Sequence, residues 1–208
     1  MMKRRSWFAV MALTVSSAWT LPALAQGEAP DALVKRMSNE VLADIKADPA
    51  LRGGDMAKIV ALVDSKVMPN VNFESITRFA AARYWAQATP EQQQRIQDEF
   101  KTLLLRTYSG ALSEVKDQTL SFRPFRANPA DTEVVVRSFV KGQGSSDIQL
   151  DYKLEKTPAG WKVIDINVLG VWLRENYRTR FAQEAGSKGV DGLIAWLAQT
   201  NKNMVGKS

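Results

Sequence analysis

The spacing of apolar residues changes from a helical to a strand period near residue 118 and returns to a helical period after Gly170. In between, Ile148, Leu150, Tyr152 and Leu154 alternate with polar residues, which is typical of a strand with one buried and one wet face. A sheet with one apolar face must place that face under helices, since its side chains are otherwise left in water. The sequence therefore predicts an α+β fold.

Amphipathic segments flank the strand region on both sides. Thr89 and Gln92 have the spacing of a capping box at the start of the best-defined helix. We predict helices over 31–46, 59–67, 73–84 and 89–115, followed by one from Leu173 and one after Gly189. We predict four mostly antiparallel strands over 120–125, 132–141, 148–155 and 161–169, curved into a half-open cone under the helices.

The first 25 residues have the features of a secretory signal. Three basic residues near the start precede an apolar run over 7–21, and Ala23-Leu24-Ala25 has the small-x-small form of a cleavage site. We expect cleavage near Ala25 and Gln26, because 15 apolar residues are fewer than the roughly 20 that a membrane-spanning helix needs. Removing 25 of 208 residues leaves 183, and losing the three basic residues lowers the net charge from +6 to +3. Such a small excess does not favour nucleic-acid binding.

The chain contains no Cys and no His. Disulfides, thiolate nucleophiles, Cys or His metal sites and the Ser-His-Asp triad therefore lack their residues. We expect no metal site, no cofactor and no enzymatic activity. The one candidate is Asp165, a carboxylate within the apolar strand Val163–Ile166, which could act as a base with a raised pKa or pair with a cation such as Arg178.

Several segments of the chain follow one another in an order that has a parallel in a known family. They are Val67-Met68-Pro69 with Phe73, Tyr84-Trp85, Thr89-Pro90-Glu91-Gln92, Gly160-Trp161-Lys162-Val163-Ile164-Asp165-Ile166, Gly170-Val171-Trp172-Leu173, Tyr177-Arg178 with Phe181, and Gly189-Val190-Asp191-Gly192. This order resembles the MlaC (toluene-tolerance) family of periplasmic phospholipid-binding proteins over nearly the whole mature chain. The sequence departs from the family at Trp172, where Ser is common, at Asn72, where Asp is common, and at Ala82, where Gly is common.

The resemblance implies one lipid-binding domain over 26–208, with an NTF2-like scaffold and extra helices. We expect helical segments over 28–116 and 171–200, a sheet over 118–169 and a loose tail over 201–208. The resemblance further implies a periplasmic monomer that shuttles phospholipid between an outer-membrane lipoprotein-porin complex and an inner-membrane ABC transporter with an MCE subunit, which maintains outer-membrane lipid asymmetry.

The apolar faces of the predicted elements provide a candidate lipid pocket. For any single residue, ordinary core packing is the competing interpretation. The candidate lining residues are Val63, Val67, Phe73, Ile76, Phe79, Phe100, Leu104, Tyr108, Val136, Ile148, Leu150, Trp161, Val163, Ile166 and Trp172. Two alternatives stay open: an enzyme that acts on an apolar small molecule with Asp165 as base, and an envelope interaction module without a ligand.

Overall fold

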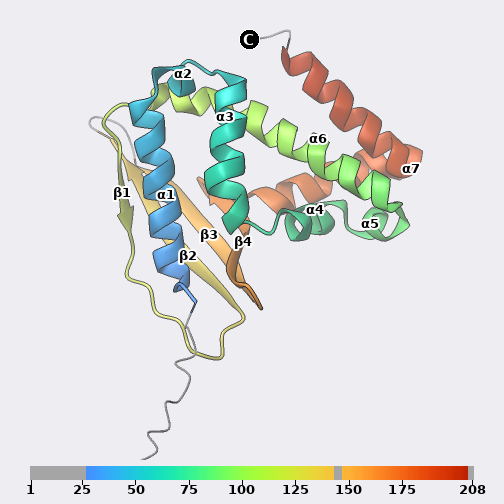
Figure 1. Cartoon of the computed structure of the whole chain (residues 1–208). Helices are drawn as coiled ribbons and strands as arrows, with labels where there is room; N and C mark the ends of the chain where they lie inside the picture. The colour runs from blue at the N-terminus through green and yellow to red at the C-terminus, as the bar shows by residue number, and fades with distance from the viewer. Residues whose placement is uncertain (1–26, 143–146, 206–208) are drawn as a thin grey trace, which may run out of the picture.

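A computed structural model describes residues 27–142 and 147–205, shown in Figure 1. The predicted signal peptide, 1–25, and most of the predicted turn at 142–146 lie outside the described residues. In chain order the elements are α1 (Pro30–Ala47), α2 (Pro49–Arg52), α3 (Met56–Leu62), η1 (Val63–Val67), η2 (Met68–Asn70), α4 (Phe73–Ala81), α5 (Arg83–Gln87), α6 (Pro90–Ser109), η3 (Gly110–Glu114), β1 (Thr119–Phe122), β2 (Glu133–Lys141), β3 (Ile148–Thr157), β4 (Gly160–Val168), β5 (Val171–Trp172) and α7 (Leu173–Val205).

Helices α1 and α3 follow the predicted spacing closely. Pro30 occupies the first position of α1, where its missing N–H costs nothing. The single turn α2 was not predicted, and Asp48 caps it by accepting a hydrogen bond from the Ala50 N–H at 2.9 Å. The predicted helix over 59–67 is α3 continued by the π-helical turn η1.

The predicted helix over 73–84 is wrong in one respect, because the chain breaks into α4 and α5 at Ala82. Ala82 has φ 49° and ψ −126°, a conformation that favours glycine and that no α-helix contains. The capping box at the start of α6 is confirmed: the Thr89 hydroxyl accepts from the Gln92 N–H, and the Gln92 side chain accepts from the Thr89 N–H. The predicted helix to Val115 ends earlier, since 110–114 is a 3₁₀ turn.

The five strands form one open antiparallel sheet in the order β1-β2-β3-β4-β5. The α+β prediction is confirmed, with one strand more than the four expected. The sequence pattern missed β5 because two residues are too few to show alternation. A tight turn at Leu169 and Gly170, both with positive φ, folds β5 back on β4.

The two predicted C-terminal helices are segments of α7, joined at Gly189, whose φ of 64° and ψ of −158° are not helical. The predicted loose tail from 201 is wrong for the described part, because α7 continues to Val205. Asn201 is buried there, and its side-chain amide donates to the Glu99 carbonyl oxygen at 2.9 Å and to the Glu99 carboxylate at 2.8 Å. These two hydrogen bonds hold the end of α7 on α6.

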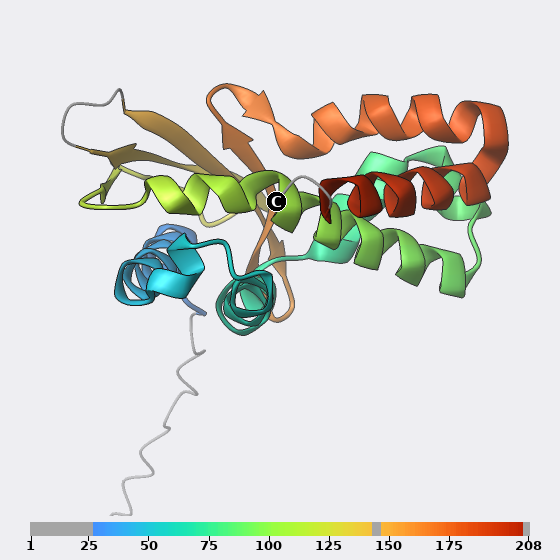
Figure 2. The same ribbon diagram turned by 90° about the horizontal axis from the view of Figure 1, so that it is seen from above.

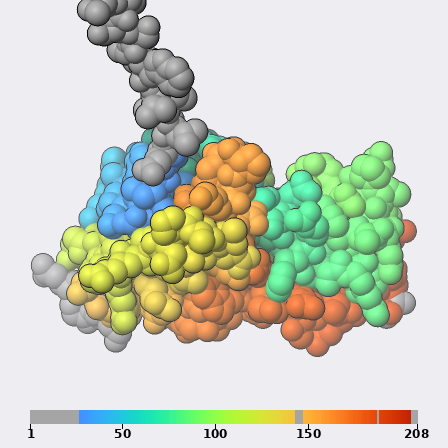
Figure 3. All heavy atoms as spheres, turned by 90° about the horizontal axis from the view of Figure 1, so that it is seen from below, coloured from blue at the N-terminus to red at the C-terminus, as the bar shows by residue number. Residues whose placement is uncertain are grey.

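The buried apolar residues form three separate clusters rather than one, distributed between the two ends of an elongated molecule. Figure 3 shows α1 and the strands at one end and α4, α5 and α7 at the other. The sheet cluster joins α1 to the strands through Leu33, Val34, Met37, Val134, Val136, Tyr152, Leu154 and Val163. The helix cluster centres on Phe100, Phe181, Leu193 and Leu197, and the groove cluster consists of Ile45, Leu51, Ile59 and Leu62.

Candidate functional site

The inner face of the sheet is the face that α1 covers, and four rows of side chains cross it. Residues paired across neighbouring antiparallel strands point to the same face, so the register defines each row. The rows are Val134, Leu154 and Val163; then Val136, Tyr152 and Ile166; then Phe122, Ser138, Leu150, Val168 and Val171; and last Leu120, Val140 and Ile148.

Helix α1 covers the first two rows and leaves the last two partly open. Val136, Leu154 and Val163 are at most 1% exposed, whereas Ile148 is 43% and Val171 49% exposed. We call the third and fourth rows the open rows. Apart from the buried Ser138 they consist of apolar residues at one end of the sheet, and of these the sequence predicted only Leu150 and Ile148 as pocket residues.

One polar contact fixes α1 on the sheet beside the open rows. The Ser38 hydroxyl of α1 donates to the Tyr152 hydroxyl at 3.1 Å, and both residues are buried. Burial raises the pKa of the Tyr152 phenol above its ordinary value. Neither residue was predicted as functional, and the pairing of a serine with a tyrosine 114 positions later has no local sequence signal.

Helix α6 crosses over the sheet in Figure 2 but packs mainly on α7, α4 and α3. Leu104 contacts the helix cluster, Leu105 contacts the groove cluster, and Tyr108 is 37% exposed. The apolar side chains in the C-terminal half of α6 are therefore divided between two clusters and the protein surface. Partial burial also raises the pKa of Tyr108.

The structure gathers ten of the fifteen candidate pocket residues into two clusters. Val67, Val136, Leu150, Trp161, Val163 and Ile166 belong to or contact the sheet cluster. Phe73, Ile76, Phe100 and Leu104 belong to or contact the helix cluster. Tyr108 and Ile148 are exposed, and Val63 is half-buried at the start of η1.

Three of the candidates have surroundings that differ from a pocket lining. Phe100 is fully buried against other rings, with Tyr177 and Phe181 at centroid distances of 4.8 and 4.9 Å. Phe79 lies under the guanidinium of Arg174, 4.2 Å from its ring centre. Trp172 pairs with Asn167 and so lies on the outer face of the sheet, because the short strand β5 places it one residue out of phase with Val171. We therefore leave Phe100, Phe79 and Trp172 out of the candidate site.

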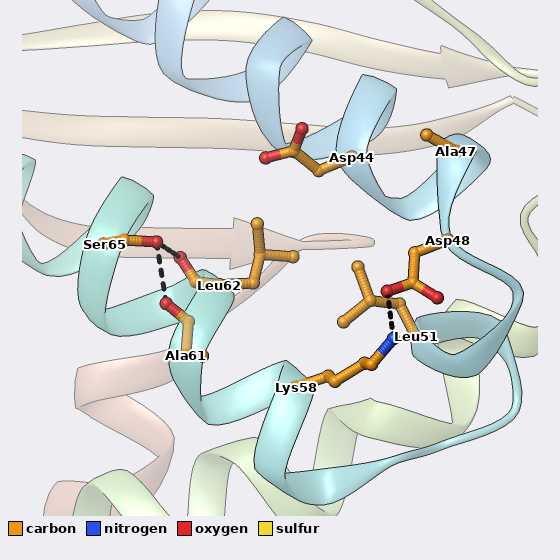
Figure 4. A pocket seen from close by; sticks show the side chains of 8 residues that line it. All are labelled: Asp44, Ala47, Asp48, Leu51, Lys58, Ala61, Leu62 and Ser65. Carbon is orange, nitrogen blue, oxygen red and sulfur yellow. Dashed lines mark hydrogen bonds and ion pairs between the residues drawn. The ribbon is translucent and has the colours of Figure 1, made fainter.

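A groove of about 580 Å³ lies between α1 and α3, on the side of the groove cluster. Figure 4 shows the side chains of Leu51 and Leu62 near one another inside it, with Lys58 reaching Asp48. The Lys58 ammonium and the Asp48 carboxylate are 2.7 Å apart and link α3 to the α1–α2 junction. The groove has an apolar base and a polar rim, and its lining is Asp44, Ala47, Asp48, Leu51, Lys58, Ala61, Leu62 and Ser65.

Asp165 is held in a structural ion pair on the outer face of the sheet. Its Oδ2 lies 3.2 Å from Nε of Arg174, and its Oδ1 accepts hydrogen bonds from the backbone N–H groups of Ile166 and Arg174. The cation is Arg174 rather than Arg178, which the sequence analysis named as one option. Burial raises the pKa of Asp165, and the backbone N–H and charge of Arg174 oppose that shift.

Within the residues that the structure describes, no group of three or more Asp or Glu side chains could hold a metal ion. No helix in 27–142 or 147–205 is long and apolar enough to cross a membrane.

Comparison with known proteins places this arrangement in a family. The model of the family described as MlaC protein matches residues 35–199. The toluene tolerance protein ttg2D of Pseudomonas putida is 27% identical over 165 residues, covering 79% of this chain and 76% of that protein. A solved structure from Ralstonia solanacearum, of a phospholipid-binding protein in complex with a phospholipid, is 50% identical, with a TM-score of 0.81 over 84% of this chain and 98% of that one. The family model spans most of the chain and both relatives share its fold or sequence, so the chain belongs to the MlaC protein family.

Proposed function

We propose that this protein is a periplasmic phospholipid carrier whose acyl-chain site is built on the open rows of the sheet. The observation that carries the proposal is a partly uncovered apolar surface on a protein whose described buried residues form three separate clusters, where a domain without a ligand usually has one contiguous core. The phospholipid complex of the 50% identical relative supports it.

Hydrophobic energetics explain how such a carrier can both hold and release lipid. Removing about 30 methylenes from water at roughly 0.8 kcal/mol each contributes on the order of 24 kcal/mol, above the ceiling of about 21 kcal/mol for non-covalent complexes. Loss of lipid into water is therefore very slow. Exchange with a bilayer moves the chains between two apolar surroundings, so the net difference is small and the partners set the direction.

The location and the partners belong to the same proposal. After cleavage near Ala25, a monomer would shuttle phospholipid between an outer-membrane lipoprotein-porin complex and an inner-membrane ABC transporter with an MCE subunit, which maintains outer-membrane lipid asymmetry. Intact mass of the exported protein tests the cleavage: a chain that begins near Gln26 supports export, and one that retains Met1 contradicts it.

A pair of charged substitutions tests the site itself. Leu150→Glu places a carboxylate in the open rows, where a lipid chain would have to desolvate it, and should lower bound phospholipid at least about tenfold. Val135→Glu is the matched control, because Val135 pairs with Lys153 on the outer face of the same sheet. Both variants are compared by circular dichroism and by extracted phospholipid per protein. Equal lipid loss in both, or in neither, contradicts the proposed site.

The enzyme alternative required Asp165 as a base. Asp165 instead forms an ion pair with Arg174 on the face of the sheet away from the open rows, which argues against that alternative. The interaction module without a ligand predicts that wild-type protein carries no phospholipid, and the same extraction distinguishes it from a carrier.

A further inference from the structure

The rim of the groove between α1 and α3 carries more negative than positive charge. Asp44, Asp48 and Lys58 line it, so the lining is net negative by one charge. Lys58 pairs with Asp48 at 2.7 Å. Asp44 is half-buried and forms no ion pair with any residue that the structure describes. The Ser65 hydroxyl donates to the Ala61 and Leu62 carbonyl oxygens and adds no charge.

The base of the groove below these charges is apolar. Leu51 and Leu62 belong to the groove cluster, against which Val41 of α1 and Leu105 of α6 also pack. Val41 lies one turn after Met37 on the same face of α1, and Met37 packs against the sheet. A ligand at the rim therefore has buried apolar side chains directly below it, which suits a molecule with a polar head and an apolar body.

We propose that this groove binds the headgroup of a zwitterionic aminophospholipid, with Asp44 as the partner of the ammonium and Lys58 as the partner of the phosphate. The inference rests on the proposed lipid-carrier function and adds a headgroup preference to it. A phosphate draws Lys58 away from Asp48, and the ammonium supplies the positive charge that the two aspartates then lack. An anionic headgroup without an ammonium supplies no positive charge. Both carboxylates then face its negative charge, so it binds less well.

The test uses the mature full-length protein incubated with vesicles of phosphatidylethanolamine and phosphatidylglycerol in equal amounts, followed by mass spectrometry of the extracted lipid. Wild type should retain the ethanolamine lipid about fivefold over the glycerol lipid, the effect of one partly exposed ion pair. Asp44→Lys should invert the ratio, and Asp44→Asn should bring it close to one. Asp98→Lys, the same charge change at an exposed position of α6 outside the groove, should leave it unchanged.

Lys58→Gln should speed the loss of both lipids to acceptor vesicles, because both carry the phosphate. Glycerophosphoethanolamine, the same headgroup without chains, should not displace bound lipid at millimolar concentration. Displacement by it would place a soluble molecule in the groove and overturn the proposal, as would a ratio that is the same in wild type, Asp44→Asn and Asp44→Lys, or an unchanged rate in Lys58→Gln. Protein that retains no phospholipid at all instead contradicts the carrier function itself.

Discussion

Replacing Arg174 by Met should expose how much the buried ion pair with Asp165 stabilises the fold. The Asp165 side chain is 4% exposed and the Arg174 side chain 13%, with 3.2 Å between their charged atoms. Removing one partner of such a pair costs about 3–5 kcal/mol, because the other charge stays buried without compensation. The Met side chain keeps contact with the Phe79 ring, and the backbone N–H of residue 174 still donates to Asp165. We therefore expect the lower end of the range, about 3 kcal/mol at pH 7.

The pH dependence of this loss identifies its cause. Burial already raises the pKa of Asp165 above its unfolded value, and losing the cation raises it further. A carboxyl with a raised folded pKa contributes stability below its unfolded pKa, and loses that contribution as the pH rises through the folded pKa. The defect of Arg174→Met should therefore be small near pH 4, where Asp165 binds a proton, and full at pH 7.

Urea unfolding followed by circular dichroism, with the lipid content of all samples matched, measures these differences. A loss of about 3 kcal/mol corresponds to a melting temperature lower by roughly 6–12 °C for a domain of this size. Arg178→Met is the matched control, because Arg178 lies one turn further on α7 over the same ring and pairs with the exposed Glu175. This substitution should cost less than about 1 kcal/mol. Adding Asp165→Asn to Arg174→Met should restore much of the stability. A loss below about 1 kcal/mol at pH 7, or one equal at pH 4 and pH 7, would refute this reasoning.

Three smaller predictions concern local structure and are measured by the same urea unfolding. Ala82→Gly should stabilise the protein by about 1 kcal/mol, because φ of 49° with ψ of −126° suits glycine, and a loss of stability would argue against strain there. Tyr152→Phe should cost about 1–2 kcal/mol by leaving the buried Ser38 hydroxyl without its partner. It should also weaken the decline in stability above about pH 10, since the unfolded tyrosine ionises before the buried one, and an unchanged alkaline limb would contradict this. Thr89→Ala should cost about 1 kcal/mol through loss of the capping box, and no change would show that the cap contributes nothing.

Periodicity predicted the fold class because each long element has one buried face. The alternation of Ile148 to Leu154 and the capping box at Thr89 are local signals, and both elements formed where they were expected. The errors fall where local signals are short or compete with tertiary packing. The break at Ala82 depends on a backbone conformation that alanine rarely adopts, and the helical tail depends on the distant contact of Asn201 with Glu99.

The candidate site was only partly predictable from the sequence. An apolar position on a strand can be assigned to a face, so Leu150 and Ile148 were identified correctly as inner-face residues. Nothing local shows which rows a helix covers, and the apolar pattern therefore also named Val136 and Val163, which are fully buried, as pocket candidates. The groove between α1 and α3 was missed because Asp44 of α1 meets Lys58 and Leu62 of α3 only after the two helices fold together.

Native mass spectrometry of the wild-type protein, purified intact without detergent, tests the carrier function most directly. We predict a major species heavier than the lipid-free chain by the mass of a phospholipid, in near-stoichiometric amount, and a strong reduction of that species in Leu150→Glu but not in Val135→Glu. A wild-type spectrum that contains only the bare chain, from protein with native circular dichroism, would contradict the central claim.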